Sequence, residues 1–235
     1  MFLSEILEQL EHGELSQLAM GGDEIHALAN CNLPNVLPHI NLGLAELYKR
    51  FPLRIEDVVV NQYDQIQTYY LDRKYARTNT KSKEPIKYIH DSEFQPFTGN
   101  VNKIEFIYDE LGEELFLNDD TEYWSLFTPT YNSILVPWPE KANQMIVHYR
   151  ASHPRIMLED LDPETEDVYL PPGYLEPLLF YIAARIFTGT NTDGQISEGN
   201  NYMQKFEQSC AKITDLNLMN NDNTSNIKLD KAGWV

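Results

Sequence analysis

The sequence predicts an α+β protein: a helical bundle, made of N-terminal helices and a C-terminal helix hairpin, with an inserted antiparallel β sheet or sandwich and an extended C-terminal arm. Three observations predict this class. Apolar residues recur at three- and four-residue steps in residues 1–52 and 157–219, as they do in helices. Residues 53–156 instead contain short runs rich in Val, Ile and Tyr between turn residues, which is typical of strands. Residues 220–235 are rich in Asn and Asp without a period, so they are expected to form the arm.

The N-terminal part is expected to hold two main helices. Residues 2–12 form an amphipathic pattern that should end near Gly13. A longer helix is expected to begin with Asn35 as its N-cap and to end at about Phe51. That start would place Pro38 in the first turn, where a missing backbone N–H does no harm.

The middle of the chain is expected to be a set of short strands joined by turns. Residues 143–150 alternate most regularly between apolar and polar side chains, and Gly112 lies near the tip of an expected hairpin turn at 109–113. Strand patterns occur at 54–60, 66–71, 101–108, 114–118, 133–136 and 143–150. Several short strands in succession favour a compact antiparallel sheet or a small sandwich.

The densest run of large apolar side chains lies at 168–187 and predicts the most buried helix of the chain. A second helix at about 195–218 has a narrow apolar seam and is expected to pack against the first as an antiparallel hairpin. Tyr174, Tyr181 and Phe187 widen the apolar face beyond what one partner helix would cover. These three residues are therefore the predicted contact with a neighbouring subunit.

The C-terminal arm ends in spaced apolar residues: Ile227, Leu229, Trp234 and Val235. A polar arm that ends in Trp-Val is typical of a docking segment, because Trp is favoured as an anchor in interfaces.

Composition excludes several classes. The formal net charge of -18 argues against a protein that grips nucleic-acid phosphates, which requires clustered Lys and Arg. The 2 cysteines are too few for a disulfide framework, and no apolar run is long enough to span a bilayer, so no membrane partner is expected. The first residues lack the pattern of a signal peptide, and synthesis in the cytosol is expected.

No stretch of the sequence matches a Gly-rich phosphate loop, HExxH, GxSxG or CxxC, and the 6 histidines are scattered. We therefore expect no catalytic residue, no metal and no cofactor, and we predict that the chain is not an enzyme. Two segments leave alternatives open. The acidic residues between 159 and 167 form either a solvated loop or paired carboxylates, and the basic stretch 73–87 is either a solvated loop, an ionic contact with an acidic neighbouring copy, or a contact for phosphate.

The order of these parts resembles the head-to-tail connector (adaptor) proteins of tailed bacteriophages, including the tail tubular protein A group of short-tailed phages. The residues that carry the resemblance are 145–156, 170–187 and 195–216, and the stretch 96–119 is similar to the β insertion of the family. The likeness is a pattern of elements over most of 34–218 rather than an invariant motif.

The resemblance implies a structural virion protein of the phage neck or tail, made in the host cytoplasm. It implies a homo-oligomeric ring, usually dodecameric, that joins the portal protein to the tail nozzle or fibre protein and extends the DNA channel. DNA would pass through this channel without specific binding, and an acidic lumen would limit sticking. In the family the C-terminal arms commonly reach onto the portal, so residues 227–235 would be the portal-binding arm.

A second function remains open from the residues alone. The aromatic-rich β region could bind carbohydrate by stacking sugars on Tyr123, Trp124, Tyr131 and Trp138. Combined with the carboxylates between 159 and 167, it would make a carbohydrate-binding or glycoside-cleaving tail-associated protein.

Overall fold

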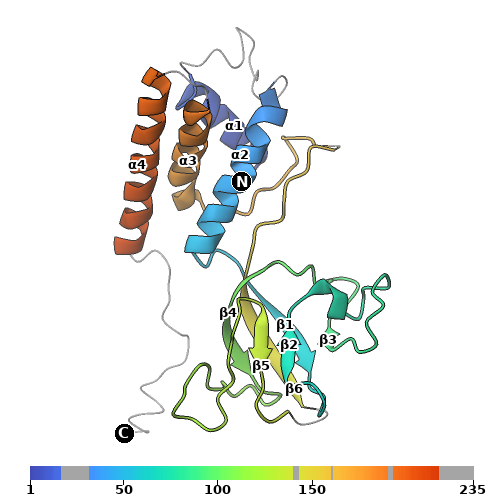
Figure 1. Ribbon diagram of the computed structural model, residues 1–235. Helices are drawn as coiled ribbons and strands as arrows, with labels where there is room; N and C mark the ends of the chain where they lie inside the picture. The colour runs from blue at the N-terminus through green and yellow to red at the C-terminus, as the bar shows by residue number, and fades with distance from the viewer. Residues whose placement is uncertain (17–31, 140–142, 160, 190–192, 217–235) are drawn as a thin grey trace, which may run out of the picture. The chain divides into compact units, whose positions relative to one another are not determined.

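The structure is a computed structural model, and it describes residues 1–16, 32–139, 143–159, 161–189 and 193–216. Within these residues four α-helices and six strands follow one another along the chain (Figure 1), which is the predicted α+β class. The chain divides into two compact units: a helical unit of Met1–Gly43 and Met157–Val235, and a β unit of Leu44–Ile156. The sequence placed the first boundary later, at 52/53, and the second at 156/157. The predicted arm at 220–235 lies outside the described residues.

Helix α1 (Leu3–His12) begins one residue after the predicted start and ends where the sequence predicted. Leu3, Ile6 and Leu10 are fully buried on its inner face. The backbone N–H of Gly13 donates to the Gln9 carbonyl at 2.9 Å and closes the last turn. The amphipathic pattern and the glycine were therefore sufficient to define this helix.

Helix α2 (Leu33–Arg50) begins earlier than expected, and the prediction of Asn35 as its N-cap is wrong. Pro38 consequently lies inside the helix, where it cannot donate the usual backbone hydrogen bond. The earlier start adds the buried side chain of Leu33 to those of Val36 and Leu37, which were already inside the predicted helix. Burial of the Leu33 side chain offsets the backbone hydrogen bond that Pro38 cannot donate inside the longer helix.

Helices α3 (Leu175–Thr188) and α4 (Asp193–Asp215) form the predicted antiparallel hairpin. The short 3-10 helix η3 (Pro172–Tyr174) precedes α3 and explains why regular helix cannot start earlier. On α4 the predicted seam faces inward at Phe206, Cys210 and Ile213, which are all buried. The seam is therefore the packing face of the hairpin.

Gly199 allows the two helices of the hairpin to approach closely. A Cβ atom at this position would lie 2.5 Å from Thr188 Oγ1, 2.9 Å from the Thr188 backbone nitrogen and 3.1 Å from the Ala184 carbonyl oxygen. Since backbone atoms cannot rotate away, we expect Gly199→Ala to destabilise the helical unit by about 1–3 kcal/mol despite the better helix propensity of Ala. Urea unfolding followed by circular dichroism at 222 nm measures the change.

Gly194→Ala is the matched control for this prediction. Gly194 lies on the same helix, and a Cβ there would meet nothing within 4 Å. The control should be neutral or slightly stabilising, because Ala is the better helix former. An equal loss of stability in both variants would contradict the assignment of Gly199 as a contact point.

The β unit contains a four-stranded antiparallel sheet in the order β3-β1-β6-β4. Its strands are β1 (Ile55–Asn61), β3 (Ile89–His90), β4 (Val101–Tyr108) and β6 (Gln144–Ala151). A second sheet pairs β2 (Thr68–Tyr70) with β5 (Ser133–Leu135). Both sheets contribute to one core, which includes Tyr69 and Ile134 from one and Ile107 and Val147 from the other.

The predicted strand at 114–118 is wrong, although the hairpin turn before it is present. Gly112 has a φ of 83°, and Asp109 Oδ1 accepts from the backbone N–H groups of Leu111 and Glu113 at 2.9 and 2.8 Å. After the turn an isolated bridge joins Tyr108 to Glu114, and the Leu115 backbone N–H donates to the Ile107 carbonyl at 2.8 Å, but residues 114–118 do not form a strand. The side chains at 110–114 are exposed, and Leu115 and Leu117 are only partly buried against the core of the β unit, so the ladder gains little from extension.

Candidate interaction surfaces

The three predicted interface residues lie on the α3 side of the hairpin, where they make contacts within the helical unit. Phe187 stacks on Tyr202 with ring centroids 5.4 Å apart, and Tyr181 meets Phe206 edge-on at 5.2 Å. Tyr174 and Phe187 are only 5% and 6% exposed. The extra apolar width that the sequence assigned to a second subunit is therefore largely used by the chain itself.

Gly43 shows how closely α2 covers the same face of α3. A Cβ at Gly43 would lie 2.6 Å from Leu178 Cδ1 and 3.1 Å from Tyr181 Cδ1. Burial raises the pKa of the Tyr174 phenol, with a smaller contribution from Cys210. The hairpin is thus a packed core element, and of the three predicted residues Tyr181 alone remains half-buried.

The acidic loop before α3 is fastened to the N-terminal segment. The backbone N–H of Leu3 donates to the Glu166 carbonyl at 3.0 Å, and that of Ser4 donates to the Pro163 carbonyl at 2.9 Å. Asp162 accepts from the Glu164 backbone N–H at 3.2 Å and so stabilises a turn. These contacts give the loop a structural role. They also give a structural role to Asp162, one of the carboxylates that the sequence left as a catalytic candidate.

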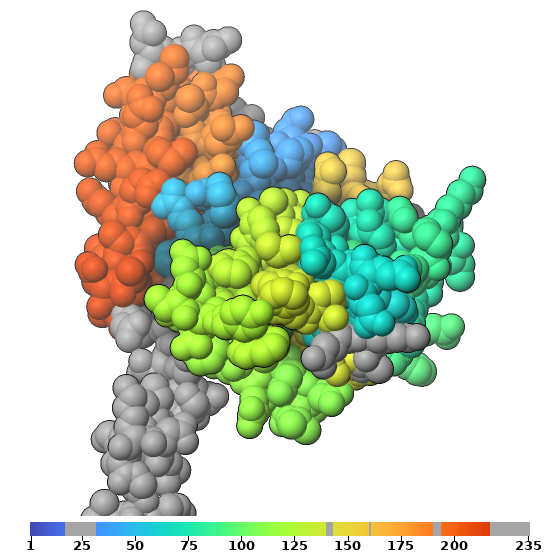
Figure 2. Space-filling view, turned by 60° about the horizontal axis from the view of Figure 1, so that its bottom comes forward, coloured from blue at the N-terminus to red at the C-terminus, as the bar shows by residue number. Residues whose placement is uncertain are grey.

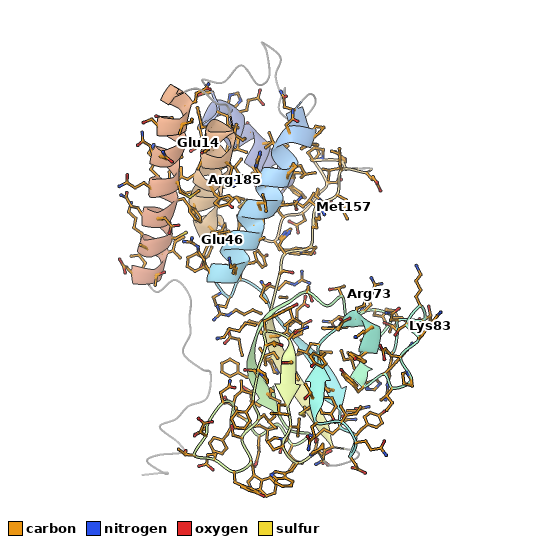
Figure 3. All side chains as sticks on the ribbon, viewed as in Figure 1. Glu14, Glu46, Arg73, Lys83, Met157 and Arg185 are labelled. Carbon is orange, nitrogen blue, oxygen red and sulfur yellow. The ribbon has the colours of Figure 1, made fainter. Side chains whose placement is uncertain are left out.

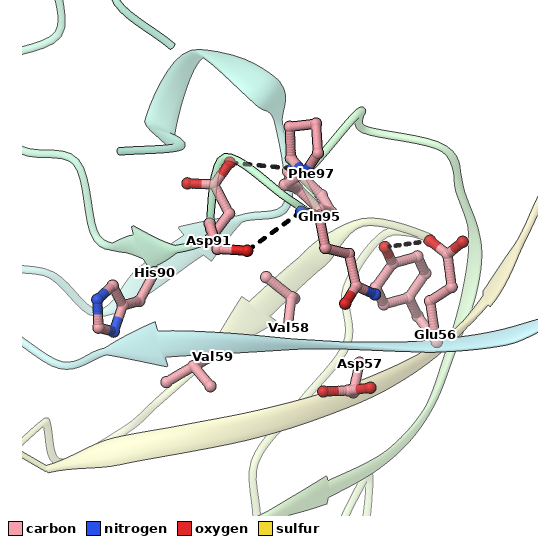
Figure 4. A pocket seen from close by; sticks show the side chains of 11 residues that line it. Glu56, Asp57, Val58, Val59, His90, Asp91, Gln95 and Phe97 are labelled. Carbon is pink, nitrogen blue, oxygen red and sulfur yellow. Dashed lines mark hydrogen bonds between the residues drawn. The ribbon is translucent and has the colours of Figure 1, made fainter. Parts of the chain in front are cut away.

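A hollow of about 240 Å³ lies beside β1 and the segment that follows β3 (Figure 4). Its volume is below the range of about 300–1,000 Å³ in which most small-molecule sites fall. Tyr149 donates to Glu56 Oε2 at 2.9 Å, and Asn100 donates to the same oxygen at 3.1 Å. Burial, followed by the Glu56 charge, raises the pKa of Tyr149. The Glu56 carboxylate therefore bridges β6 to the segment before β4.

Asp91, at the edge of the same hollow, joins three segments of the β unit. Its Oδ1 accepts from the Thr78 backbone N–H at 3.0 Å, and its Oδ2 accepts from the Thr78 hydroxyl and from the Phe97 backbone N–H at 3.0 Å. Burial of the carboxylate raises the pKa of Asp91, but the hydrogen bonds from Thr78 and Phe97 outweigh burial and the net pKa is lowered. The ionised form of Asp91 is thus the one that the folded unit favours.

We expect Asp91→Asn to lower the free energy of unfolding by about 1–2 kcal/mol at pH 7, because an amide keeps at most part of these acceptor contacts. A carboxyl whose pKa is lowered on folding contributes stability above its unfolded pKa, and loses that contribution as pH falls through the folded value. The difference between wild type and variant should therefore shrink as pH falls from 7 to below about 3.8. Urea unfolding at a series of pH values measures it.

Asp120→Asn is the control for this titration, since Asp120 is exposed in the same unit and accepts no hydrogen bond in the described part of the chain. Its stability should follow that of wild type at every pH. A gap between wild type and Asp91→Asn that is independent of pH would contradict a role for the ionised carboxylate.

Three aromatic side chains form an exposed cluster on the loops of the β unit. Tyr123 packs edge-on to Trp124 at 5.1 Å and stacks on Trp138 at 5.8 Å. The three are between 55% and 65% exposed. In Figure 2 the stretch that contains these three residues, coloured green to yellow, lies on the surface that faces the viewer. Tyr131 is also exposed, at 63%.

The loops beneath this aromatic cluster are held in one conformation. The Ser125 hydroxyl is buried and accepts from the Asp119 backbone N–H at 2.9 Å. Asn118 has a φ of 56°, and its side chain accepts from the Thr128 backbone N–H at 2.9 Å. A cluster of exposed aromatic rings on an ordered base is typical of a binding surface rather than of a core.

The stretch 73–87, which we call the basic loop, connects β2 to β3 and is also ordered. It begins with the 3-10 helix η2 (Arg73–Tyr75), and Figure 3 shows Arg73 and Lys83 on this loop. The Ser82 hydroxyl donates to the Lys74 carbonyl at 2.6 Å, and the Asn79 side chain donates to the Arg73 carbonyl at 3.0 Å. These internal hydrogen bonds hold the loop in one shape.

Sequence reasoning did not single out Asp91 or the arrangement of the aromatic cluster. The partners of Asp91 lie 13 and 6 residues away, so no local motif marks it. Tyr123 and Trp138 come together only because the loops that carry them fold side by side. The strongest available signal was the proline on each side of Trp138, which restricts the backbone there.

Comparisons with known proteins return neither a matching family model nor a matching curated protein. Among the residues that the structure describes, no helix combines the length and apolar character needed to cross a membrane. In the same residues, no group of three or more His, Cys, Asp or Glu side chains is placed to hold a metal ion.

Proposed function

We propose that this chain is a structural virion protein, a ring-forming head-to-tail adaptor that joins a portal protein to a phage tail and extends the DNA channel. The observation that carries the proposal is the order of its parts. The β unit of Leu44–Ile156 begins within α2 and precedes the C-terminal helix hairpin, so the strands lie between N-terminal and C-terminal helices in the chain, an order like the one that the resemblance to phage connectors implies. The net charge of -18 supports the channel role, because an acidic wall repels the DNA backbone.

Under this proposal the helix hairpin supplies rigidity and other parts of the surface supply the contacts. The hairpin buries most of its own apolar residues, so it serves as a scaffold for the subunit. The arm residues Ile227, Leu229, Trp234 and Val235 would bind the portal, and they stay a prediction from the sequence. The exposed aromatic cluster is a second contact candidate, for the tail nozzle or fibre protein.

Electron microscopy of portal rings from the same source, mixed with the purified chain, tests the proposal. We expect one layer of added density on each ring, with a fixed ratio of chain to portal. Removal of residues 220–235, or the substitution Trp234→Ala, should reduce the decoration, whereas Asn221→Ala in the same arm should not. Undecorated portal rings at saturating protein would overturn the adaptor proposal, and full decoration by the truncated chain would overturn the role of the arm alone.

The aromatic cluster favours a second candidate function, carbohydrate binding by a tail-associated protein. Exposed aromatic rings held on ordered loops can stack against the apolar faces of sugars, and Tyr123, Trp124 and Trp138 meet both conditions. A glycan array read with the intact chain tests this candidate. Binding that is lost in Trp124→Ala and Trp138→Ala but kept in the exposed control Phe94→Ala would support it, and no bound glycan would dispose of it.

Cleavage of a glycan is a separate question from binding. Glu159→Gln, Asp162→Asn and Glu166→Gln remove the candidate carboxylates one at a time. Hydrolysis of a bound glycan by wild type, lost in one of these variants, would support the glycoside-cleaving form. Release of no product by wild type would exclude cleavage of that glycan.

A further inference from the structure

Charge in the β unit is separated into two segments of opposite sign. The basic loop (73–87) contains six basic residues and one acidic residue: Arg73, Lys74, Arg77, Lys81, Lys83, Lys87 and Glu84. Residues 109–122, which we call the acidic segment, contain no basic residue and seven acidic ones: Asp109, Glu110, Glu113, Glu114, Asp119, Asp120 and Glu122. The basic loop therefore holds a third of the 18 Lys and Arg side chains of the chain.

The fold places these segments at opposite edges of the four-stranded sheet. The basic loop leads directly into β3, which is one edge strand in the order β3-β1-β6-β4. The acidic segment follows β4, which is the other edge strand. In Figure 1 the two segments accordingly extend from opposite sides of the sheet. The β unit thus has one positive and one negative edge.

Most of these charges face solvent. Arg73, Arg77, Lys81 and Lys83 are exposed and form no ion pair within the described part of the chain. Lys74 is the exception, since its Nζ lies 4.0 Å from Glu84. In the acidic segment, Glu110, Glu113, Glu114, Asp120 and Glu122 are exposed and likewise form no ion pair with another described residue.

The basic loop is also preorganised for a partner. Asp91 holds Thr78 through backbone and side-chain hydrogen bonds, and the Lys87 ammonium donates to the Asn79 carbonyl. The ring of Tyr75 stacks on buried Tyr88 at 4.5 Å, which fixes the start of the loop. A contact made by an ordered loop loses less conformational entropy than one made by a flexible segment.

We propose that the basic loop of one copy binds the acidic segment of the next copy. Outside the basic loop the chain is strongly acidic, so two copies repel each other except where this loop meets an acidic surface. Because the two segments are different patches on one chain, the contact is heterologous, and repetition of a heterologous contact closes a ring when the rotation permits. The inference rests on the proposed adaptor function for the ring, and the contact itself can be measured without a portal.

The observations favour a second copy over nucleic acid as the partner. Phosphate binding gains from clustered Lys and Arg, but the surrounding negative charge opposes the approach of DNA. The acidic segment, in contrast, supplies a complementary surface on the same polypeptide, at the opposite edge of the sheet from the basic loop. Electrostatic complementarity of this kind chiefly sets the orientation and the rate of association.

A charge-swap experiment tests the proposal with the full chain. The first variant, Lys81→Glu with Lys83→Glu, reverses the basic loop, and the second, Glu110→Lys with Glu113→Lys, reverses the acidic segment. Sedimentation velocity at low ionic strength should show concentration-dependent self-association of wild type that weakens with added salt. Each variant alone should associate at least tenfold more weakly. An equimolar mixture of the two should recover association, because each reversed segment then meets an opposite charge.

Arg155→Glu with Lys212→Glu is the matched control, since it changes the net charge as the first variant does at two exposed positions outside both segments. It should associate as wild type does. Monomeric wild type at about 100 µM, equal weakening by the control, or a mixture that fails to recover would overturn the proposal. A different result would also overturn the proposal: wild type binds a DNA duplex, the first variant does not, and neither protein self-associates. The partner of the basic loop would then be phosphate.

Portal decoration separates this inference from the adaptor function. If wild type decorates portal rings and the first variant decorates them equally well in closed rings, the charge contact is wrong and the adaptor function stands. If wild type fails to decorate the portal but the charge-swap mixture recovers association, the adaptor function fails and the contact between copies stands.

Discussion

Phe206→Ala is expected to lower the free energy of unfolding of the helical unit by about 3–5 kcal/mol, the largest effect expected within the helix hairpin. The Phe206 side chain is fully buried on α4 and meets the Tyr181 ring edge-on at 5.2 Å. Its removal deletes a large apolar side chain and leaves a cavity between α3 and α4 that the two packed helices cannot fully close.

Hydrogen exchange read by mass spectrometry measures this effect in each unit separately, which matters because a chain with two units need not unfold in one step. Amides of α3 and α4 should lose protection, while those of β1 and β6 should change little. Phe94→Ala is the control, because the Phe94 side chain is fully exposed. Equal loss of protection in both variants would argue against Phe206 as the centre of the hairpin.

The second large effect is expected from Tyr88→Ala in the β unit, again about 3–5 kcal/mol. The Tyr88 ring is 2% exposed, stacks on Tyr75 at 4.5 Å and meets Tyr69 edge-on at 5.1 Å. Its hydroxyl accepts from the Tyr70 backbone N–H at 2.8 Å and donates to the Tyr70 carbonyl at 3.0 Å. The variant therefore loses both the ring packing and the hydrogen bonds that connect it to β2.

Tyr88→Phe separates these two contributions. It keeps the ring and removes the hydroxyl, so a loss of about 1–2 kcal/mol is expected from the Tyr70 groups that it leaves without this partner. Urea unfolding and hydrogen exchange at β2 and β3 measure both variants. If Tyr88→Phe lowers the free energy of unfolding as much as Tyr88→Ala does, the hydrogen bonds, and not the ring, stabilise this part of the core.

Tyr88→Ala also has a consequence for assembly. Tyr75 lies in the first turn of the basic loop and stacks on the Tyr88 ring, so removal of the Tyr88 ring should loosen the loop even in molecules that remain folded. We therefore expect weaker self-association than in wild type under conditions where β6 amides keep their protection. This outcome would connect the aromatic core of the β unit to the proposed contact between copies.

Local patterns predicted the elements that depend on near neighbours in the sequence. The three- and four-residue steps of α1, α3 and α4 and the alternation of β6 were sufficient, because each pattern directly reflects one buried face. The prediction failed at Asn35, because α2 begins two residues earlier, at Leu33, whose side chain is buried. It also failed at 114–118, where Glu114 and Leu117 pair only through isolated bridges, with Tyr108 and Leu126.

For the candidate surfaces, too, the sequence alone predicted some features and the tertiary structure decided others. Composition alone showed that the basic loop is an exception in an acidic chain, since charge can be counted without a fold. The sheet order β3-β1-β6-β4 decided that the basic loop and the acidic segment lie at opposite edges, because strand pairing joins residues far apart in sequence. Packing likewise decided that Tyr174 and Phe187 are used inside the chain, since the apolar width of a helix does not specify whether its own chain or a neighbour covers it.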